Sequence, residues 1–161
     1  FRTRIYNRSA EKISLELKKK VRGKTQKISC ALTREQCLML MAGEIPEIGT
    51  DAPPVFQKLC LLMRTRLLRP RVIVEYDRTP YVYPLGNVRI TLDENIRASG
   101  KTDLFLEQDV PERLILPAGQ HILEVKYDEY LPDFIYRTVQ MENLRQTAFS
   151  KYYLCRKYNL Y

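Results

Sequence analysis

The chain has 161 residues, 45% of them hydrophobic, so it is long enough to bury a sizeable core and too apolar for a disordered segment. Lysine and arginine (27) outnumber aspartate and glutamate (19), and the net charge of +8 indicates an anionic partner: nucleic acid, a membrane surface or a phosphate-rich small molecule. No apolar run reaches the roughly 18 residues of a membrane span and no secretory signal is visible, which predicts a cytoplasmic protein.

The first part of the chain predicts three strands followed by two helices. Strict alternation of apolar and polar residues indicates strands at 1–6, 13–20 and 26–32, separated by a polar turn and by a glycine turn within "VRGKT". A short helix is expected within 33–44, with Thr33 as its N-cap and with Leu38 and Met41 on its buried side. A longer amphipathic helix is expected at 55–68, after a loop and before Pro70.

The second part predicts three more strands and two closing helices. The strands are expected at 71–78, 88–94 and 121–129, with turn residues at 79–87 and an irregular polar stretch at 95–119. The helices are expected at 132–144 and 148–158. With no repeat, low-complexity segment or linker, residues 1–161 are predicted to form one α+β domain with a mostly antiparallel sheet of about six strands.

Cysteine and histidine exclude several kinds of chemistry. Cys30, Cys37, Cys60 and Cys155 lack paired or CxxC spacing, so we expect reduced and mostly buried thiols. His121 is the single histidine, which argues against a Ser-His-Asp relay and a histidine-rich metal site and leaves His121 a structural residue.

Polar residues, nearly all of them charged, recur at every second position on four of the predicted strands. These sets are Arg2 and Arg4; Glu16, Lys18 and Lys20; Arg89, Thr91 and Asp93; and Glu124, Lys126 and Asp128. The simpler interpretation is a sheet whose charged face lies in water. The alternative is a curled sheet whose charged face lines a lumen, where something anionic such as a polyphosphate would have to neutralise the arginines.

Glu124 stands among cations on a predicted central strand. It is expected either to pair with Lys126 or a neighbouring arginine, or to bind a divalent cation together with phosphate oxygens. No Walker A, GxGxxG, DFG or zinc-finger pattern occurs. The tyrosines are scattered rather than clustered as in RNA-binding motifs, so nucleic acid is not expected as a partner.

The order of several motifs is similar to that of a known family. "FRTRIYN", "LELKKK", "QKISCALTREQ", "LLRPRVIVEYDRTPYVYPLGNVRITLDENIR", "LEVKYDEYLPDFI" and "QTAFSKYYLCRKY" resemble the polyphosphate polymerase domain of the vacuolar transporter chaperone family in its stand-alone bacterial form. That domain belongs to the triphosphate tunnel metalloenzymes. The resemblance covers nearly the whole chain and implies an antiparallel β-barrel with flanking helices and a basic lumen.

The resemblance also implies roles for individual residues. Side chains that would contact phosphate during catalysis are Arg2, Arg4, Lys18, Lys27, Arg78, Arg89, Lys126 and Lys151, and within this set Arg4, Lys18, Arg78 and Arg89 would bind the nucleotide or phosphate chain. Glu124 resembles the glutamate that binds Mn²⁺ or Mg²⁺, and Glu16 is a second candidate ligand. The family's first strand, of the E-x-K-Y type, is not seen before "RTRIYN", so the barrel is expected to lack its N-terminal strands here, and any membrane tether would lie in a region outside this sequence.

The implied reaction transfers the γ-phosphate of ATP to a polyphosphate chain, and no protein nucleophile is needed because the attacking group is itself a phosphate. Two alternatives stay open. One is a tunnel-fold triphosphatase that hydrolyses inorganic or nucleoside triphosphate. The other is a non-catalytic module that binds polyphosphate.

Overall fold

A computed structural model describes residues 1–21, 24–140 and 147–158. The chain divides into two compact units. The first comprises residues 1–73 and 100–111, and the second comprises residues 74–99 and 112–161.

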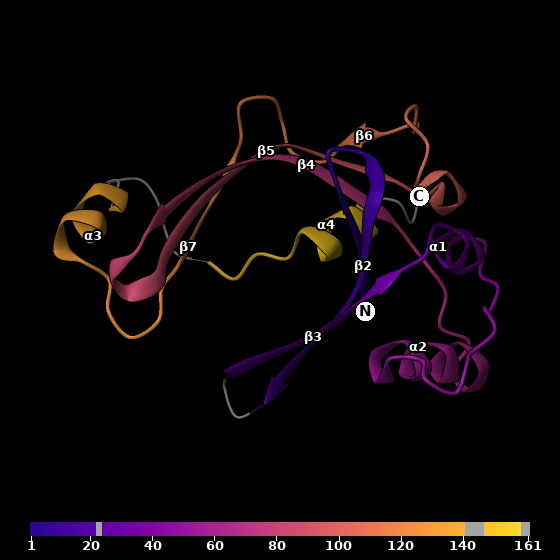
Figure 1. The fold of residues 1–161 in the computed structure, drawn as a ribbon. Coiled ribbons are helices and arrows are strands. Elements are labelled where there is room, and N and C mark those ends of the chain that lie inside the picture. The colour runs from indigo at the N-terminus through magenta and orange to yellow at the C-terminus, as the bar shows by residue number, and fades with distance from the viewer. Residues whose placement is uncertain (22–23, 141–146, 159–161) are drawn as a thin grey trace. The chain divides into compact units, whose positions relative to one another are not determined.

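The first unit is built on an antiparallel sheet of three strands in the order β1–β2–β3 (Figure 1). These strands are β1 (Arg2–Tyr6), β2 (Ser9–Val21) and β3 (Lys24–Leu32). Asn7 and Arg8, with φ of 51° and 52°, form a two-residue turn between the paired residues Tyr6 and Ser9. Because positive φ at both central residues suits a tight hairpin, β2 starts earlier than the polar pattern predicts. The predicted glycine turn falls at 22–23, outside the described residues.

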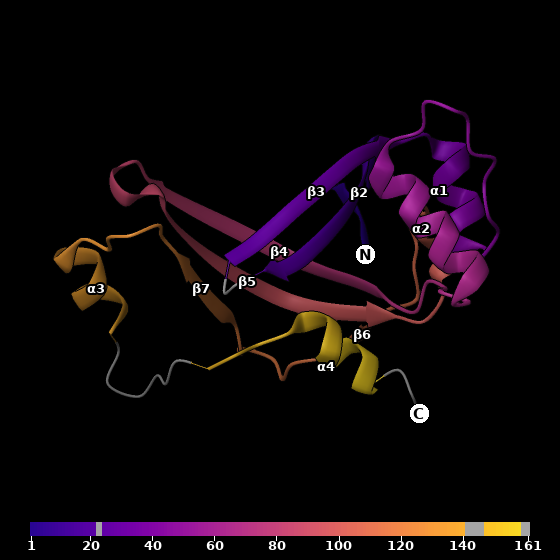
Figure 2. The same ribbon diagram turned by 90° about the horizontal axis from the view of Figure 1, so that it is seen from below.

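Two helices follow the sheet, α1 (Arg34–Met41) and α2 (Pro54–Thr65), and they lie side by side in Figure 2. Thr33 caps α1 as predicted: its hydroxyl accepts a hydrogen bond from the Gln36 backbone N–H at 3.1 Å, and the Gln36 side chain accepts one from the Thr33 N–H. The prediction that Leu38 is buried is wrong. Leu38 is 39% exposed because α1 turns Cys37 and Leu40 inward, with Met41 packed at the edge of the core.

The core of the first unit lies between its sheet and its helices. Apolar residues of β2 meet the stripe on α2 that its sequence spacing predicts. The buried core residues are Ile13, Leu15, Leu32, Cys37, Leu40, Val55, Phe56, Leu59, Cys60, Met63 and Leu106. A 3₁₀ turn, η2 (Thr102–Leu104), contacts α1 through a hydrogen bond from the Thr102 hydroxyl to the Met41 carbonyl at 3.5 Å.

The second unit is built around β5 (Val88–Ser99), which pairs with β4, β6 and β7. The neighbouring strands are β4 (Ile73–Tyr83), β6 (Arg113–Leu114) and β7 (Ile122–Lys126), and η1 (Leu85–Asn87) joins β4 to β5. The pairings of β5 with β6 and with β7 are antiparallel. β6 pairs with the C-terminal end of β5, and β7 pairs with its N-terminal half.

Two stretches expected to be irregular are parts of long strands. β4 continues through Pro80 to Tyr83, and β5 continues past Asn95 to Ser99. Asn95 has a φ of 49°, a conformation that interrupts regular alternation, and its side chain donates to Asp77 of β4 at 2.8 Å. The local break at Asn95 hides the continuation of β5 from the sequence pattern.

The helices of the second unit are α3 (Asp133–Val139) and α4 (Lys151–Tyr158). The predicted helix 132–144 ends at Val139, and residues 141–146 lie outside the described residues. α4 packs on β5, and Cys155 of α4 is fully buried. Across the described ranges no helix is long and apolar enough to cross a membrane.

The prediction of an α+β fold with antiparallel sheets and flanking helices is confirmed. The described strands number seven rather than about six, and they form two sheets without a closed barrel among them. The barrel therefore stays a prediction. All four cysteines are free thiols and three of them are buried, as predicted.

Candidate functional site: two cationic clusters on the strands

The first unit carries a buried carboxylate surrounded by cations, which we name the Glu16 cluster (Glu16, Arg2, Arg4 and Lys27). Glu16 lies in the middle of β2 and its side chain is 3% exposed. Arg2, its partner across β1 and β2, donates from Nε at 3.0 Å and also forms an ion pair through Nη2. The Lys27 ammonium of β3 lies 2.8 Å from Oε1 of Glu16, and Nη1 of Arg4 lies 4.0 Å from the same oxygen.

These contacts determine the charge state of Glu16. Burial by itself would raise its pKa, but hydrogen bonds from Lys27 and Arg2 and the nearby charge of Arg4 lower it to about 2. The carboxylate therefore stays ionised at any physiological pH. Lys18, which is paired with Lys27 across β2 and β3, adds a further cation to these strands.

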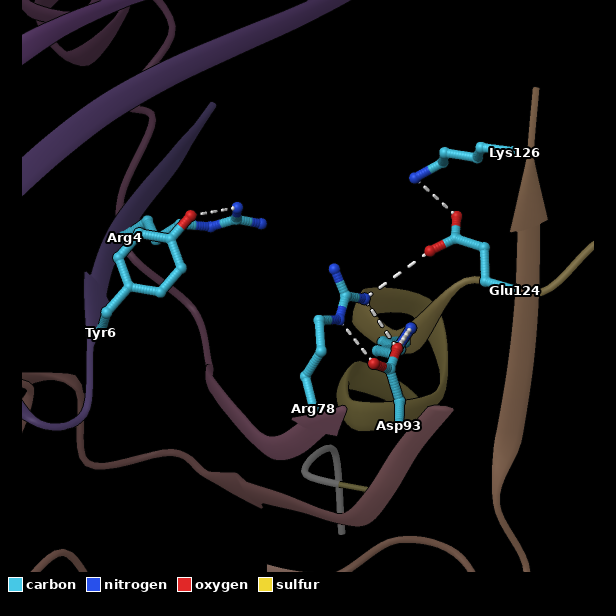
Figure 3. Close-up of polar contacts among 7 residues, drawn as sticks. Arg4, Tyr6, Arg78, Asp93, Glu124 and Lys126 are labelled. Carbon is cyan, nitrogen blue, oxygen red and sulfur yellow. Dashed lines mark hydrogen bonds and ion pairs between the residues drawn. The ribbon is translucent and has the colours of Figure 1, made fainter. Parts of the chain in front are cut away.

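Arg4 is also fixed from a second side. Its Nη1 donates to the Tyr6 hydroxyl at 2.9 Å, and its guanidinium carbon lies 5.5 Å from the centre of the Tyr6 ring (Figure 3). The two residues stand at alternate positions of β1 and so share one face, as the sequence predicts.

The second unit carries a second group, the Asp93 cluster (Asp93, Arg78, Lys151, Glu124 and Lys126). Asp93 of β5 is fully buried, with 0% of its side chain exposed. Its two oxygens accept hydrogen bonds from Nε and Nη2 of Arg78 at 2.6 and 2.8 Å. Lys151, the first residue of α4, places its ammonium 2.5 Å from Oδ2 of Asp93.

Glu124 of β7 extends this cluster toward solvent. Figure 3 shows the Arg78 guanidinium between Asp93 and Glu124, with Nη2 at 3.6 Å from Oε2 of Glu124. The ammonium of Lys126 lies 2.8 Å from the other oxygen of Glu124. Burial raises the pKa of Glu124, but the Lys126 hydrogen bond and the charges of Lys151 and Arg78 outweigh it and the net pKa is lowered. Both ion-pair partners considered from the sequence are thus observed.

The register between β5 and β7 places Arg89, another predicted phosphate contact, near this cluster. Arg89 of β5 pairs with Lys126 of β7, and Thr91 pairs with Glu124, so these side chains share one face of the sheet. Arg89 is exposed, and among the described residues no ion pair engages its guanidinium. The Thr91 hydroxyl is buried and has no hydrogen-bond partner in the described part of the chain.

The carboxylates of the two clusters can be compared with the known requirements of a divalent cation. Mg²⁺ and Mn²⁺ are commonly held by one or two carboxylates together with phosphate oxygens and water. In residues 1–21, 24–140 and 147–158 no three His, Cys, Asp or Glu side chains gather as a metal site, so a cage made of protein alone does not fit. A cation held mainly by phosphate fits at Glu124, whose side chain is 36% exposed. Glu16 and Asp93 are buried and saturated by cations, which favours an ion-pair role for both.

The sequence assigned no role to Asp93 or to Tyr76, a residue that contacts the Asp93 cluster. The sequence pattern marks Asp93 only as one of several alternating polar residues. The signal that could have singled it out is an acid on a central strand next to a strand that carries an arginine. Tyr76 of β4 was missed: its ring lies 5.1 Å from the guanidinium carbon of Arg78 and 5.1 Å from the Lys151 ammonium. Of the predicted residues, Arg2, Arg4, Lys27 and Glu16 come together in one unit, and Arg78, Lys126, Lys151 and Glu124 in the other.

Comparison with known proteins gives a match to a protein family. The family model described as the VTC domain matches residues 1–159. Neither the curated proteins nor the solved structures contain a significant match to this chain.

Proposed function

This chain belongs to the VTC domain family, which is associated with polyphosphate chemistry, and we propose that it is a phosphotransferase that moves the γ-phosphate of ATP onto a polyphosphate chain. The observation that carries the proposal is the excess of cations in both clusters. Three cationic side chains meet one carboxylate in the Glu16 cluster. Three meet two carboxylates in the Asp93 cluster, with Arg89 beside them on the same face.

A surplus of arginine and lysine suits a phosphate chain. Each phosphate unit carries negative charge, and the planar guanidinium forms paired hydrogen bonds to phosphate oxygens. Carboxylates already contact the charged groups of most of these side chains, yet Lys27 and Lys126 remain about half exposed and Arg89 is exposed. The exposed cations are the groups that would meet the phosphate chain first.

Phosphoryl transfer depends on neutralising charge on the transferred group and on holding the attacking and leaving oxygens in line. In the proposed reaction a terminal oxygen of the chain forms a bond to the γ-phosphorus, and the bond from that phosphorus to the β–γ bridging oxygen breaks, leaving ADP. Arg78, Arg89 and Lys126 would neutralise the transferred group. Glu124 would hold a Mn²⁺ or Mg²⁺ ion, which when bound supplies further charge neutralisation on phosphate oxygens.

The test is incubation of the purified protein with ATP and Mn²⁺, and separately with Mg²⁺, followed by quantification of ADP, orthophosphate and long-chain polyphosphate. We expect polyphosphate and ADP in equal phosphate equivalents. Orthophosphate without chains would contradict the transferase and identify a triphosphatase. Binding of tripolyphosphate without any turnover would identify a non-catalytic module.

Arg89→Ala provides a clean variant because no ion pair in the described residues depends on Arg89. Loss of one phosphate contact should lower the rate about tenfold or more. Lys58→Ala, which removes an exposed cation from α2, is the matched control and should retain full activity. Equal loss in both variants would show that overall charge alone supports activity.

A further inference from the structure

Asp93 belongs to none of the phosphate-contacting or metal-binding roles considered above, yet it is the most enclosed charged residue described. A buried carboxylate is costly unless its charge is matched by close hydrogen-bonded partners. Arg78 and Lys151 supply these partners from β4 and α4, so three elements of the second unit meet at one side chain.

We propose that Asp93 is a positioning residue: it fixes the guanidinium of Arg78 and the ammonium of Lys151 in one orientation, ready to receive a triphosphate group. This inference rests on the proposed function, since it concerns the orientation of two proposed phosphate contacts. Asp93 itself is fully buried and would not contact the phosphate.

The geometry at Arg78 supports this role. A guanidinium has five N–H donors in a rigid plane, and Asp93 takes the edge formed by Nε and Nη2. Two-point contact fixes both the position and the rotation of the plane. The opposite amine, Nη1, has no partner among the described residues and is left to bind phosphate.

Lys151 is held by a matching arrangement. Its ammonium touches Oδ2 of Asp93 and lies over the ring of Tyr76, which Arg78 also contacts. Lysine side chains otherwise sample many rotamers, and ordering one on binding costs free energy. Asp93 and Tyr76 restrict that freedom before any ligand arrives, and they hold the first turn of α4 against β5.

The positioning role and a simple count of charges predict opposite effects of Asp93 on the binding of an anion. A carboxylate within a phosphate-binding cluster lowers the local positive charge and should weaken binding of an anion. Asp93→Asn keeps the shape of the side chain and makes the cluster more cationic. If Asp93 positions Arg78 and Lys151, this variant binds tripolyphosphate more weakly in spite of its added positive charge.

The experiment is titration of the purified protein and of Asp93→Asn with tripolyphosphate, well below the unfolding midpoint of each. We expect the dissociation constant to rise about tenfold in Asp93→Asn, the effect of misplacing one charge-assisted contact. Glu107→Gln, which removes an exposed negative charge outside both clusters, is the control and should bind as well as the parent protein. Unchanged or tighter binding by a folded Asp93→Asn overturns the proposal.

A measurement on the unaltered protein avoids any folding defect of the variant. By NMR, the Arg78 Nε–H and Lys151 ammonium signals should be protected from exchange before ligand is added and should remain so when tripolyphosphate binds. The Arg78 Nη1 signals should shift on binding. Loss of Nε–H protection on binding would show that phosphate displaces Asp93, and would overturn the positioning role.

The two proposals fail in different ways. Tripolyphosphate binding that depends on Asp93, without polyphosphate synthesis from ATP, would reject the phosphotransferase and retain the positioning role. Synthesis from ATP that Asp93→Asn leaves unaffected, together with unchanged tripolyphosphate binding, would do the reverse. A parent protein that does not bind tripolyphosphate would reject both.

Discussion

Two acids of the strand faces are buried, and several cationic side chains near them are exposed. Glu16 and Asp93 are 3% and 0% exposed, whereas Lys27 and Lys126 are about half exposed. The carboxylates contact the charged groups of these side chains directly, as Glu16 does at Nζ of Lys27, and yet the lysine side chains remain about half exposed to solvent. A strand face that lies wholly in water would not bury its acids in this way.

Glu16 gives a prediction on the pH dependence of stability. Its pKa is about 2 in the folded chain and near 4.5 when unfolded, so the unfolded state binds protons more readily. The stabilisation is complete above pH 4.5 and is lost as the pH falls toward 2. Glu16→Gln should lower the free energy of unfolding by about 1–3 kcal/mol at pH 7.

Urea unfolding of the parent protein and of Glu16→Gln between pH 7 and pH 2 measures this effect. The two stability curves should converge as the pH falls, because the parent loses the contribution that the variant already lacks. Glu11→Gln, on an exposed carboxylate of the same strand, is the control and should leave the curve unchanged. A constant difference between parent and Glu16→Gln at every pH would contradict the ionic origin.

At the scale of secondary-structure elements, the turn between β4 and β5 depends on one glycine. Gly86 has a φ of 75°, in the left-handed region, and a Cβ atom there would lie 2.3 Å from the Tyr130 carbonyl oxygen. The Gly86 carbonyl accepts a hydrogen bond from the Asp128 N–H at 3.0 Å. The close approach therefore ties this turn to the segment that follows β7.

Gly86→Ala should lower the unfolding free energy by more than about 1 kcal/mol, because both the backbone conformation and the contact with Tyr130 become unfavourable. Gly100→Ala is the matched control: its φ is not in the left-handed region and an added Cβ meets no atom within 4 Å. Thermal unfolding of the two variants checks the difference. Equal midpoints would show that the turn rearranges without cost.

At the scale of the whole molecule, the net charge of +8 is distributed so that each unit has its own cationic cluster. The net positive charge should attract an anion over long distances, and hydrogen bonds and ion pairs should then hold it at short range. Salt screens the first effect more than the second, because the Debye length is about 10 Å at 0.1 M and about 3 Å at 1 M ionic strength.

Tripolyphosphate affinity should therefore decrease steadily between about 50 mM and 500 mM NaCl without disappearing. Isothermal titration calorimetry across this range gives the measurement, and an unchanged unfolding midpoint over the same range is the control. Affinity independent of salt would indicate that binding does not use the cationic clusters.

Local sequence patterns were sufficient to predict many structural features of this protein. Alternation predicted the strands that carry Arg2, Glu16 and Glu124, and the N-cap preference of Thr33 predicted the start of α1. These features depend on neighbours within a few residues, where backbone geometry alone fixes which side chains share a face. The order of the motifs also identified the family, as the match over residues 1–159 confirms.

Other features depended on contacts between residues far apart in the sequence. The true extent of β5, the inward face of α1 and the environment of Tyr76 follow from pairing and packing that no local pattern contains. Asp93 is the clearest case: the sequence by itself determined that it stands on an alternating charged strand, in a basic chain of the VTC domain family. Only the tertiary structure brought Arg78, 15 residues before it, and Lys151 of α4 to the same carboxylate, because burial makes an unmatched charge too costly to tolerate.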